Sequence, residues 1–308
     1  MTSGTIFRFT RTRILVVATL LVTVLGGCAF LDTKQRELIF RPAKEDVSWG
    51  IRSEAVQEVW LPLRGVDKAR TRGDVDGGAD RGVDDSEKIH AWWWPADQAD
   101  APTMLYLHGA RWNLTGNAFR IARLRKMGFN VLAIDYRGFG RSSGTLPSER
   151  DAYEDAVTAW EYVKSRERDP AKRFVFGHSL GGAVAVELAL RSPEMAGLIL
   201  ESTFTNMRDM ASHMWVPMRY LPVGLVLTQH FDTLAKIDRV SVPILMVHGR
   251  ADRWVPPEMS ERLFAVATTR KRLLMIDDAS HSNVSAVGYD SYFAAICEFF
   301  GIPRERAP

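Results

Sequence analysis

Short apolar runs alternate with longer amphipathic segments from residue 102 almost to the end of the chain. The runs, rich in Val, Ile and Leu, predict strands at 103–109, 130–136, 173–178, 197–203, 243–249 and 272–278. The segments between them predict helices at 117–127, 148–167, 180–191, 257–267 and 286–300. Strands that alternate with helices form parallel sheets through right-handed crossovers. We therefore predict an α/β fold with a mostly parallel central sheet flanked by helices.

Two further strands are predicted ahead of this region, at 54–63 and 88–96, as an opening antiparallel pair. The segment between them, 67–87, is rich in Gly and Asp, which is typical of a mobile loop. Its aspartates resemble a calcium loop only superficially, because the flanking helices and the closing glutamate are missing. We predict no metal site there.

About forty residues separate the strand at 197–203 from the next one, and this spacing breaks the alternation. We predict that residues 204–240 form a short helical cap over the carboxyl ends of the strands. The cap is dense in flexible and aromatic apolar side chains that could line a site for an apolar chain. The candidate substrate-binding residues are Met207, Met210, Met214, Trp215 and Met218. Packing of the cap onto the body would explain the same residues.

The N-terminus has the layout of a bacterial lipoprotein signal peptide. Three arginines precede an apolar run at 14–25, and LGGC resembles a lipobox that ends at Cys28. Cleavage there would leave Cys28 as the first residue, with acyl chains that anchor it to a membrane. An uncleaved membrane helix or plain secretion are the alternatives. We therefore divide the chain into a signal peptide (1–27), a tether (28–53) and a domain that contains the predicted sheet (54–308).

Charge and cysteine content narrow the possible partners. The 308 residues carry a formal net charge of +3, with 40 basic and 37 acidic residues. Cleavage before Cys28 would remove three arginines and no acid, so the mature chain would be neutral and nothing indicates a nucleic-acid partner. Cys297, in AAICEFF, is expected as a buried thiol on a helix.

The stretch FVFGHSLGGAVAV places Ser179 between a strand and a helix in the pattern G-x-S-x-G. This nucleophile elbow lifts the serine above the sheet on a sharp turn, and its glycines let neighbouring backbone pass closely. The helix that follows points its amino end at the reaction centre, which favours developing negative charge. Ser179 is therefore the candidate nucleophile.

A serine nucleophile needs a base and an acid that orients the base. Asp252 follows the strand at 243–249, and His281 follows the last strand, so the order Ser, Asp, His matches this type of fold. Glu201 is the second choice for the acid. The other histidines, including His248, are predicted to be structural or remote. Backbone N–H groups of Leu180 and Ala110 are expected to bind the oxyanion.

The motifs LHGARWN, DYRGFGRSSG, GHSLGG, HGRADRWVP and ASHSN occur in this order over residues 102–302. Together they resemble the α/β-hydrolase superfamily, near its serine aminopeptidase-like and monoacylglycerol-lipase-like branch. The resemblance implies hydrolysis of an ester, thioester or amide through an acyl-serine, without a metal or organic cofactor. It does not identify the substrate.

We expect a serine carboxylic-ester hydrolase that acts on an amphipathic acyl ester. A peptidase or amidase, and a non-catalytic envelope binding protein on the same fold, are the alternatives. We place the protein in the bacterial cell envelope, lipid-anchored, and Ala29 after Cys28 favours the outer membrane if the cell has two. The sequence does not indicate an oligomeric state.

Overall fold

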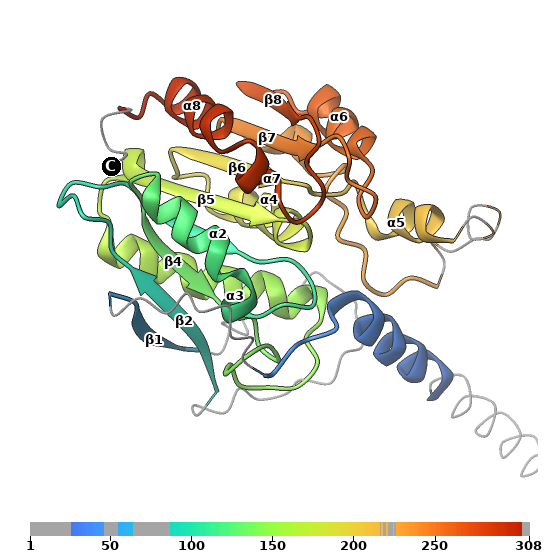
Figure 1. Cartoon of the computed structure of the whole chain (residues 1–308). Coiled ribbons are helices and arrows are strands. Elements are labelled where there is room, and N and C mark those ends of the chain that lie inside the picture. The colour runs from blue at the N-terminus through green and yellow to red at the C-terminus, as the bar shows by residue number, and fades with distance from the viewer. Residues whose placement is uncertain are drawn as a thin grey trace, which may run out of the picture.

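The computed structural model describes residues 26–45, 55–63, 87–215, 217, 220, 224 and 226–303, and these form one eight-stranded sheet with helices on both faces (Figure 1). The strands are β1 (Gln57–Pro62), β2 (Lys88–Trp94), β3 (Thr103–Leu107), β4 (Asn130–Ile134), β5 (Arg173–His178), β6 (Gly197–Glu201), β7 (Ile244–Gly249) and β8 (Lys271–Ile276). Their order across the sheet is β1-β2-β4-β3-β5-β6-β7-β8.

The strand directions agree with the prediction of an opening antiparallel pair followed by a parallel sheet. β1 and β2 are antiparallel to each other, and β2 is antiparallel to β4. All other neighbouring strands are parallel. The carboxyl ends of β3 through β8 therefore meet at one edge of the sheet, which is where such folds place ligand sites.

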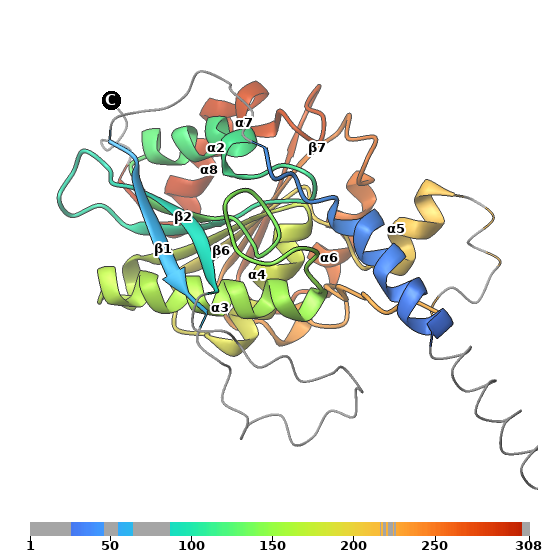
Figure 2. The ribbon, with the colours of Figure 1, turned by 90° about the horizontal axis from the view of Figure 1, so that it is seen from below.

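Two apolar cores cover the two faces of the sheet. One contains buried residues of α3 (Glu149–Arg166), α4 (Leu180–Arg191) and α6 (Pro257–Val266). The other contains buried residues of α2 (Leu114–Lys126), α7 (Val284–Val287) and α8 (Tyr289–Phe300), including Cys297. Figure 2 shows α3 and α4 on one side of the sheet, with α2 and α8 on the other. The α/β-hydrolase fold predicted from the motifs has this arrangement.

Most helix boundaries agree with the sequence prediction, and one does not. Ser148 caps α3, because its side chain accepts a hydrogen bond from the N–H of Asp151, whose carboxylate in turn accepts from the N–H of Ser148. The helix predicted at 286–300 is instead divided into α7 and α8 at Gly288. A Cβ at this position would lie 2.7 Å from Ile276 Cδ1, so a larger residue here would displace the Ile276 side chain of β8.

The cap region contains α5 (Met207–Met214) and a short helix, η4 (Ile237–Arg239). Met207 and Met210 are partly buried against the core, so these two methionines pack the cap onto the body. Met214 and Trp215 are 57% and 55% exposed, so these two side chains do not pack the cap onto the body. The position of Met218 lies outside the described residues.

The segment predicted as a tether begins with a helix. Residues 26–40 are helical and lie on the same side of the molecule as α5 in Figures 1 and 2. Gln35 donates to the carbonyl of Val226 at 2.7 Å and accepts from the N–H of Thr228 at 2.9 Å. Phe40 is fully buried against Phe139 and Phe231. The first half of the predicted tether is therefore fastened to the body.

Several predictions concern residues outside the described ranges. These are most of the signal peptide at 1–27, the later part of the tether, and all but the last residue of the loop at 67–87. Cys28 is described and is exposed. Within the described ranges, no helix combines the length and apolar character that a membrane crossing requires.

Candidate active site

Ser179 sits on a strained turn between β5 and α4. Its φ of 53° and ψ of −117° lie in a region that non-glycine residues rarely adopt, as expected for a nucleophile elbow. Added Cβ atoms at Gly177 and Gly181 would approach Gly181 O to 2.3 Å and Leu107 O to 2.1 Å. Both glycines are therefore required by close backbone contacts, as the sequence pattern predicts.

The neighbouring strand β6 and the residues just after it fix the backbone of this turn. The N–H of Ser179 donates to the carbonyl of Glu201 at 2.9 Å. The hydroxyl of Thr203 donates to the carbonyl of Ser179 at 2.8 Å. These bonds to the end of β6 and the residues just after it hold the serine at the carboxyl edge of the sheet.

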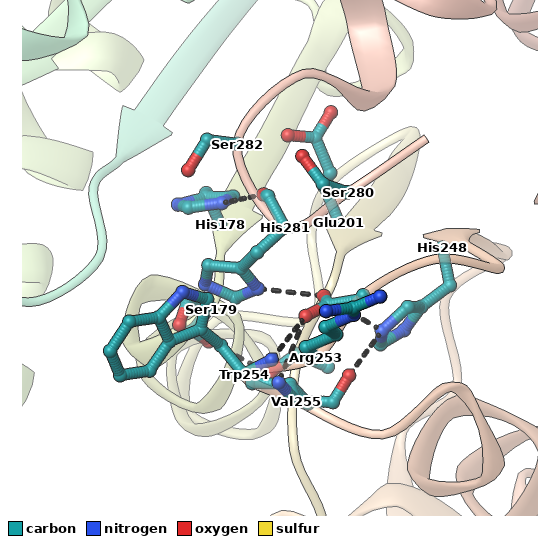
Figure 3. Close-up of polar contacts among 12 residues, drawn as sticks. His178, Ser179, Glu201, His248, Arg253, Trp254, Val255, Ser280, His281 and Ser282 are labelled. Carbon is teal, nitrogen blue, oxygen red and sulfur yellow. Dashed lines mark hydrogen bonds and ion pairs between the residues drawn. The ribbon is translucent and has the colours of Figure 1, made fainter. Parts of the chain in front are cut away.

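Asp252 lies in the loop after β7, and both of its carboxylate oxygens accept hydrogen bonds. Oδ1 accepts from the N–H groups of Trp254 at 2.9 Å and Val255 at 3.0 Å. Oδ2 lies 2.7 Å from Nδ1 of His281, which follows β8 (Figure 3). The structure therefore brings Asp252 and His281 together from two adjacent strand ends.

The alternative acids have other partners. Glu201 is fully buried and forms an ion pair with Arg120 at 3.0 Å. Asp277 pairs with Arg250 at the surface, where its side chain is 82% exposed. The geometry thus favours Asp252, the first choice from the sequence, as the residue that orients His281.

His248 also contacts Asp252, which the sequence interpretation did not anticipate. Its Nε2 lies 3.1 Å from Asp252 Oδ2 and 3.0 Å from the carbonyl of Val255, so this nitrogen carries the proton and donates. Its Nδ1 lies 2.6 Å from the hydroxyl of Ser260. Burial of Asp252 opposes its ionisation, but the hydrogen bonds from His248 and His281 outweigh that effect and lower its pKa.

His178, next to the serine, links the turn to the loop that carries His281. The rings of His178 and His281 have centroids 4.9 Å apart, and Nε2 of His178 lies 3.1 Å from the carbonyl oxygen of His281. Figure 3 shows Ser179, His178 and His281 in this region. Asp252 is bonded to His281, and His281 contacts the residue before Ser179, so the three predicted residues lie at the same edge of the sheet.

The loop after β3, which contains the predicted second oxyanion donor Ala110, lies against the nucleophile turn. A Cβ added to Gly109 would lie 3.1 Å from Ser179 Cβ, so the backbone leading to Ala110 runs directly against the serine. The next residue, Arg111, has a φ of 76°. Its N–H donates to the carbonyl of Phe40 at 2.8 Å, and its carbonyl accepts from the N–H of Ala43 at 3.2 Å. The chain just after helix 26–40 thus fastens this loop.

Leu180 is the first residue of α4, so its N–H has no carbonyl one turn earlier in the helix to accept it. The macrodipole of α4 adds partial positive charge at the same place. The N–H of Leu180 is therefore available to donate a hydrogen bond to a negatively charged group at the start of α4, as the sequence prediction requires.

Two other residues of the site had no signal in the sequence pattern. Trp254 is 54% exposed, and the guanidinium of Arg111 lies 4.8 Å from its ring, which joins the loop after β3 to the loop after β7. Arg120, on α2, is 4% exposed and reaches the loop of His281. Trp254 lies in the motif HGRADRWVP and Arg120 lies in none of the motifs, but neither contact could be predicted, because each joins segments far apart in the chain.

The described residues do not include a group of three or more His, Cys, Asp or Glu side chains that could hold a metal ion. The polar groups described above include Ser179, the imidazoles of His178, His248 and His281, the carboxylate of Asp252, and backbone N–H groups. This set suits acyl transfer to a serine.

Comparison with known proteins identifies relatives of the same kind. A family model described as serine aminopeptidase matches residues 99–234. A Mycobacterium tuberculosis protein is 34% identical over 203 residues, which cover 65% of this chain and 70% of that protein. A lysophosphatidylserine lipase of Danio rerio is 33% identical over 199 residues, or 59% of this chain and 51% of the lipase.

A solved structure extends the likeness to the fold. The Pyrococcus furiosus esterase aligns with a TM-score of 0.62 at 17% sequence identity, over 85% of this chain and 99% of the esterase. The alignment covers far more of this chain than the family model does. At this level of identity it supports a common architecture.

Proposed function

Because the chain belongs to the α/β-hydrolase superfamily, we propose that it is a serine hydrolase that cleaves carboxylic esters of amphipathic acyl groups through a covalent acyl-serine. The observation that carries the proposal is the 2.7 Å hydrogen bond from His281 to Asp252, beside a serine held on a strained turn. This bond fixes the imidazole with its proton on Nδ1, so that Nε2 can accept the proton of a hydroxyl.

In the acylation step, Oγ of Ser179 attacks the carbonyl carbon of the ester while Nε2 of His281 takes the hydroxyl proton. The tetrahedral oxyanion accepts hydrogen bonds from the N–H groups of Ala110 and Leu180, each worth on the order of 3 kcal/mol. The ester bond then breaks, and His281 returns the proton to the leaving alcohol. The product is an acyl-serine.

Deacylation repeats the same steps with water. Nε2 of His281 takes a proton from water as the oxygen attacks the acyl carbon, and the oxyanion forms between the same N–H groups. When the intermediate collapses, Ser179 regains its proton from His281 and the carboxylic acid leaves. The ester and one water yield one acid and one alcohol, without a cofactor.

Exposed apolar side chains near the site support an amphipathic substrate. Trp112 and Trp254 are 49% and 54% exposed in the loops after β3 and β7, and Met214 and Trp215 are exposed at the end of α5. Single exposed apolar side chains are common on protein surfaces, but several of them beside one site suit an acyl chain. The lipase name of the Danio rerio relative points to the same substrate class.

We further propose that Cys28 carries the lipid anchor, which would hold the enzyme at the outer face of a bacterial membrane. The exposed position of Cys28 on the helix at 26–40 leaves its thiol accessible. Metabolic labelling with a radioactive lipid precursor should mark the protein, and Cys28→Ser should abolish both the label and sedimentation with membranes. Equal labelling of this variant would reject the anchor.

The catalytic proposal is tested with p-nitrophenyl esters from acetyl to palmitoyl, using the full chain in detergent. Ser179→Ala should abolish turnover, and Ser282→Ala, an exposed serine beside His281, should retain it. The chain length with the highest kcat/KM measures the acyl site. If Ser179→Ala is as active as the wild type, the acyl-serine mechanism is wrong; cleavage of aminoacyl p-nitroanilides in preference to esters would instead indicate a peptidase.

A further inference from the structure

Arg120 is a buried cation that connects three segments of the site. It projects from α2, has an exposed fraction of 4%, and belongs to none of the motifs that identify the catalytic residues. Its contacts reach the end of β6, the residue before the nucleophile, and the loop of the base. A charge in such a position is costly unless every donor is satisfied.

The first contact neutralises the cation. Nε of Arg120 donates to Oε1 of Glu201 at 3.0 Å, and Glu201 is fully buried. The backbone carbonyl of the same glutamate accepts the N–H of Ser179 at 2.9 Å. The ion pair is therefore attached directly to the nucleophile turn.

The second set of contacts holds the loop of the base. Nη2 of Arg120 donates to the carbonyl of Ser282 at 3.0 Å and lies 3.4 Å from the carbonyl of His281. The same nitrogen lies 3.1 Å from Nε2 of His178. Burial, with further contributions from Arg120 and His281, lowers the pKa of His178 well below its ordinary value, so this ring is neutral.

We propose that the Arg120–Glu201 ion pair is a positioning device for the general base: the guanidinium fixes the backbone of His281 and Ser282 against the nucleophile turn, and the carboxylate cancels its charge. The cancellation matters because the imidazole of His281 becomes positively charged in each transition state. An uncompensated Arg120 guanidinium close to His281 would oppose the transfer of the Ser179 proton to the imidazole. This inference rests on the proposed acyl-serine function and adds two residues to its mechanism.

Charged and titratable groups from every neighbouring element face this region. The groups that set its electrostatics come from α2, β3, β5, β6, the loop after β7, and α8: Arg120, Arg123, Tyr106, His178, Glu201, Asp252 and Tyr292. Tyr106 and Tyr292 are buried, and burial raises the pKa of each above its ordinary value, so both stay neutral. The charges to be varied are therefore those of Arg120 and Glu201.

The test compares pH profiles of kcat/KM for charge variants in the full chain. Glu201→Gln leaves the cation uncompensated and should move the acidic limb of the profile to lower pH by about one unit. Arg120→Met removes the cation and the loop contacts, so it should lower kcat on the order of 100-fold with little change in KM, and should not move the acidic limb downward. If the ion pair only stabilised the fold, Glu201→Gln would not shift the acidic limb and Arg120→Met would not lower kcat at constant KM.

Two further variants keep the result interpretable if Arg120→Met fails to fold. Arg120→Lys preserves the charge but loses the forked contacts, so it should keep the wild-type acidic limb and still lower kcat about tenfold. Arg125→Met, the same substitution type on the same helix at a surface pair with Asp97, should leave kcat and the profile unchanged. Thermal unfolding of each variant reports any loss of stability separately.

The outcomes distinguish this inference from the proposed function. If Ser179→Ala is inactive but Arg120→Lys keeps wild-type kcat, or Glu201→Gln leaves the acidic limb in place, the positioning role is rejected and the acyl-serine mechanism stands. If Ser179→Ala is as active as the wild type, both proposals fall. Loss of kcat in Arg120→Lys together with the downward shift in Glu201→Gln would establish the positioning role.

Discussion

Replacing Asp252 by Asn is the most direct perturbation of the candidate base. The amide oxygen can still accept the N–H groups of Trp254 and Val255, which now bond to Oδ1. The amide nitrogen then takes the place of Oδ2, where His281 and His248 both donate. The N–H groups of His281 and His248 would then face the NH₂ group of the new amide, which is also a donor. His281 avoids this repulsion by moving its proton from Nδ1 to Nε2.

The magnitude follows from that change of tautomer. With its proton on Nε2, His281 presents a donor to Ser179 and cannot accept the hydroxyl proton. The corresponding substitution in a serine protease triad lowers kcat about 10⁴-fold. At 1.36 kcal/mol per factor of ten, this is about 5 kcal/mol of transition-state stabilisation. The loss of a buried charge-assisted hydrogen bond should also lower the free energy of unfolding by about 1–3 kcal/mol.

The assay is turnover of the best p-nitrophenyl ester at pH 8, with single-turnover kinetics to isolate acylation. Asp277→Asn is the matched control, because that carboxylate is 82% exposed and pairs only with Arg250 among the described side chains. It should retain wild-type kcat. If Asp252→Asn keeps more than a tenth of wild-type kcat, Asp252 does not set the tautomer of His281 and the reasoning is refuted.

Three other predictions follow from the geometry. Gly181→Ala would bring a Cβ to 2.1 Å from Leu107 O, so thermal unfolding should show a large loss of Tm, whereas an unchanged Tm would contradict the close backbone approach. Phe40→Ala removes a fully buried ring and should cost about 3–5 kcal/mol in urea unfolding, with a lower kcat because the Phe40 backbone holds Arg111; a cost below 1 kcal/mol would mean that the segment is not docked. The pKa of Asp252 in the folded protein lies below its ordinary value of 3.8, so the stabilising effect of this carboxylate is complete above about pH 5 and is lost as the pH falls through the folded-state pKa. The difference in unfolding free energy between wild type and Asp252→Asn should therefore shrink below about pH 4. A difference that grows there would contradict the assignment.

The sequence predicts those parts of the structure that depend on local pattern. The strands from β3 to β8 are continuous apolar runs because both faces of the sheet are covered, and each run appears at its predicted place. The glycines around Ser179 mark a backbone constraint that a pentapeptide can encode. Asp252 and His281 follow strand ends, so topology alone brings them to one edge.

Contacts between distant segments could not be predicted in the same way. Arg120 is one of several arginines on an amphipathic helix, and only the tertiary structure reveals that it points inward to Glu201. His248 and Asp252 lie in one motif, HGRADRWVP, but the letters of the motif do not show that the two side chains bond to each other. The helix at 26–40 packs on the body through contacts with residues far away in the chain, such as the bonds of Gln35 to Val226 and Thr228, and a local pattern does not encode such contacts.

The length of the helix at 26–40 limits the distance between the candidate active site and the membrane to which the proposed lipid on Cys28 would attach the protein. Phe40 lies twelve positions after Cys28, and at 1.5 Å per position this offset spans about 18 Å of helix. Phe40 is in turn bonded to Arg111 in the loop beside Ser179. A surface attached at Cys28 would thus be connected to the candidate active site by a short helix that is packed on the body. The site would lie close to that surface and in a restricted orientation.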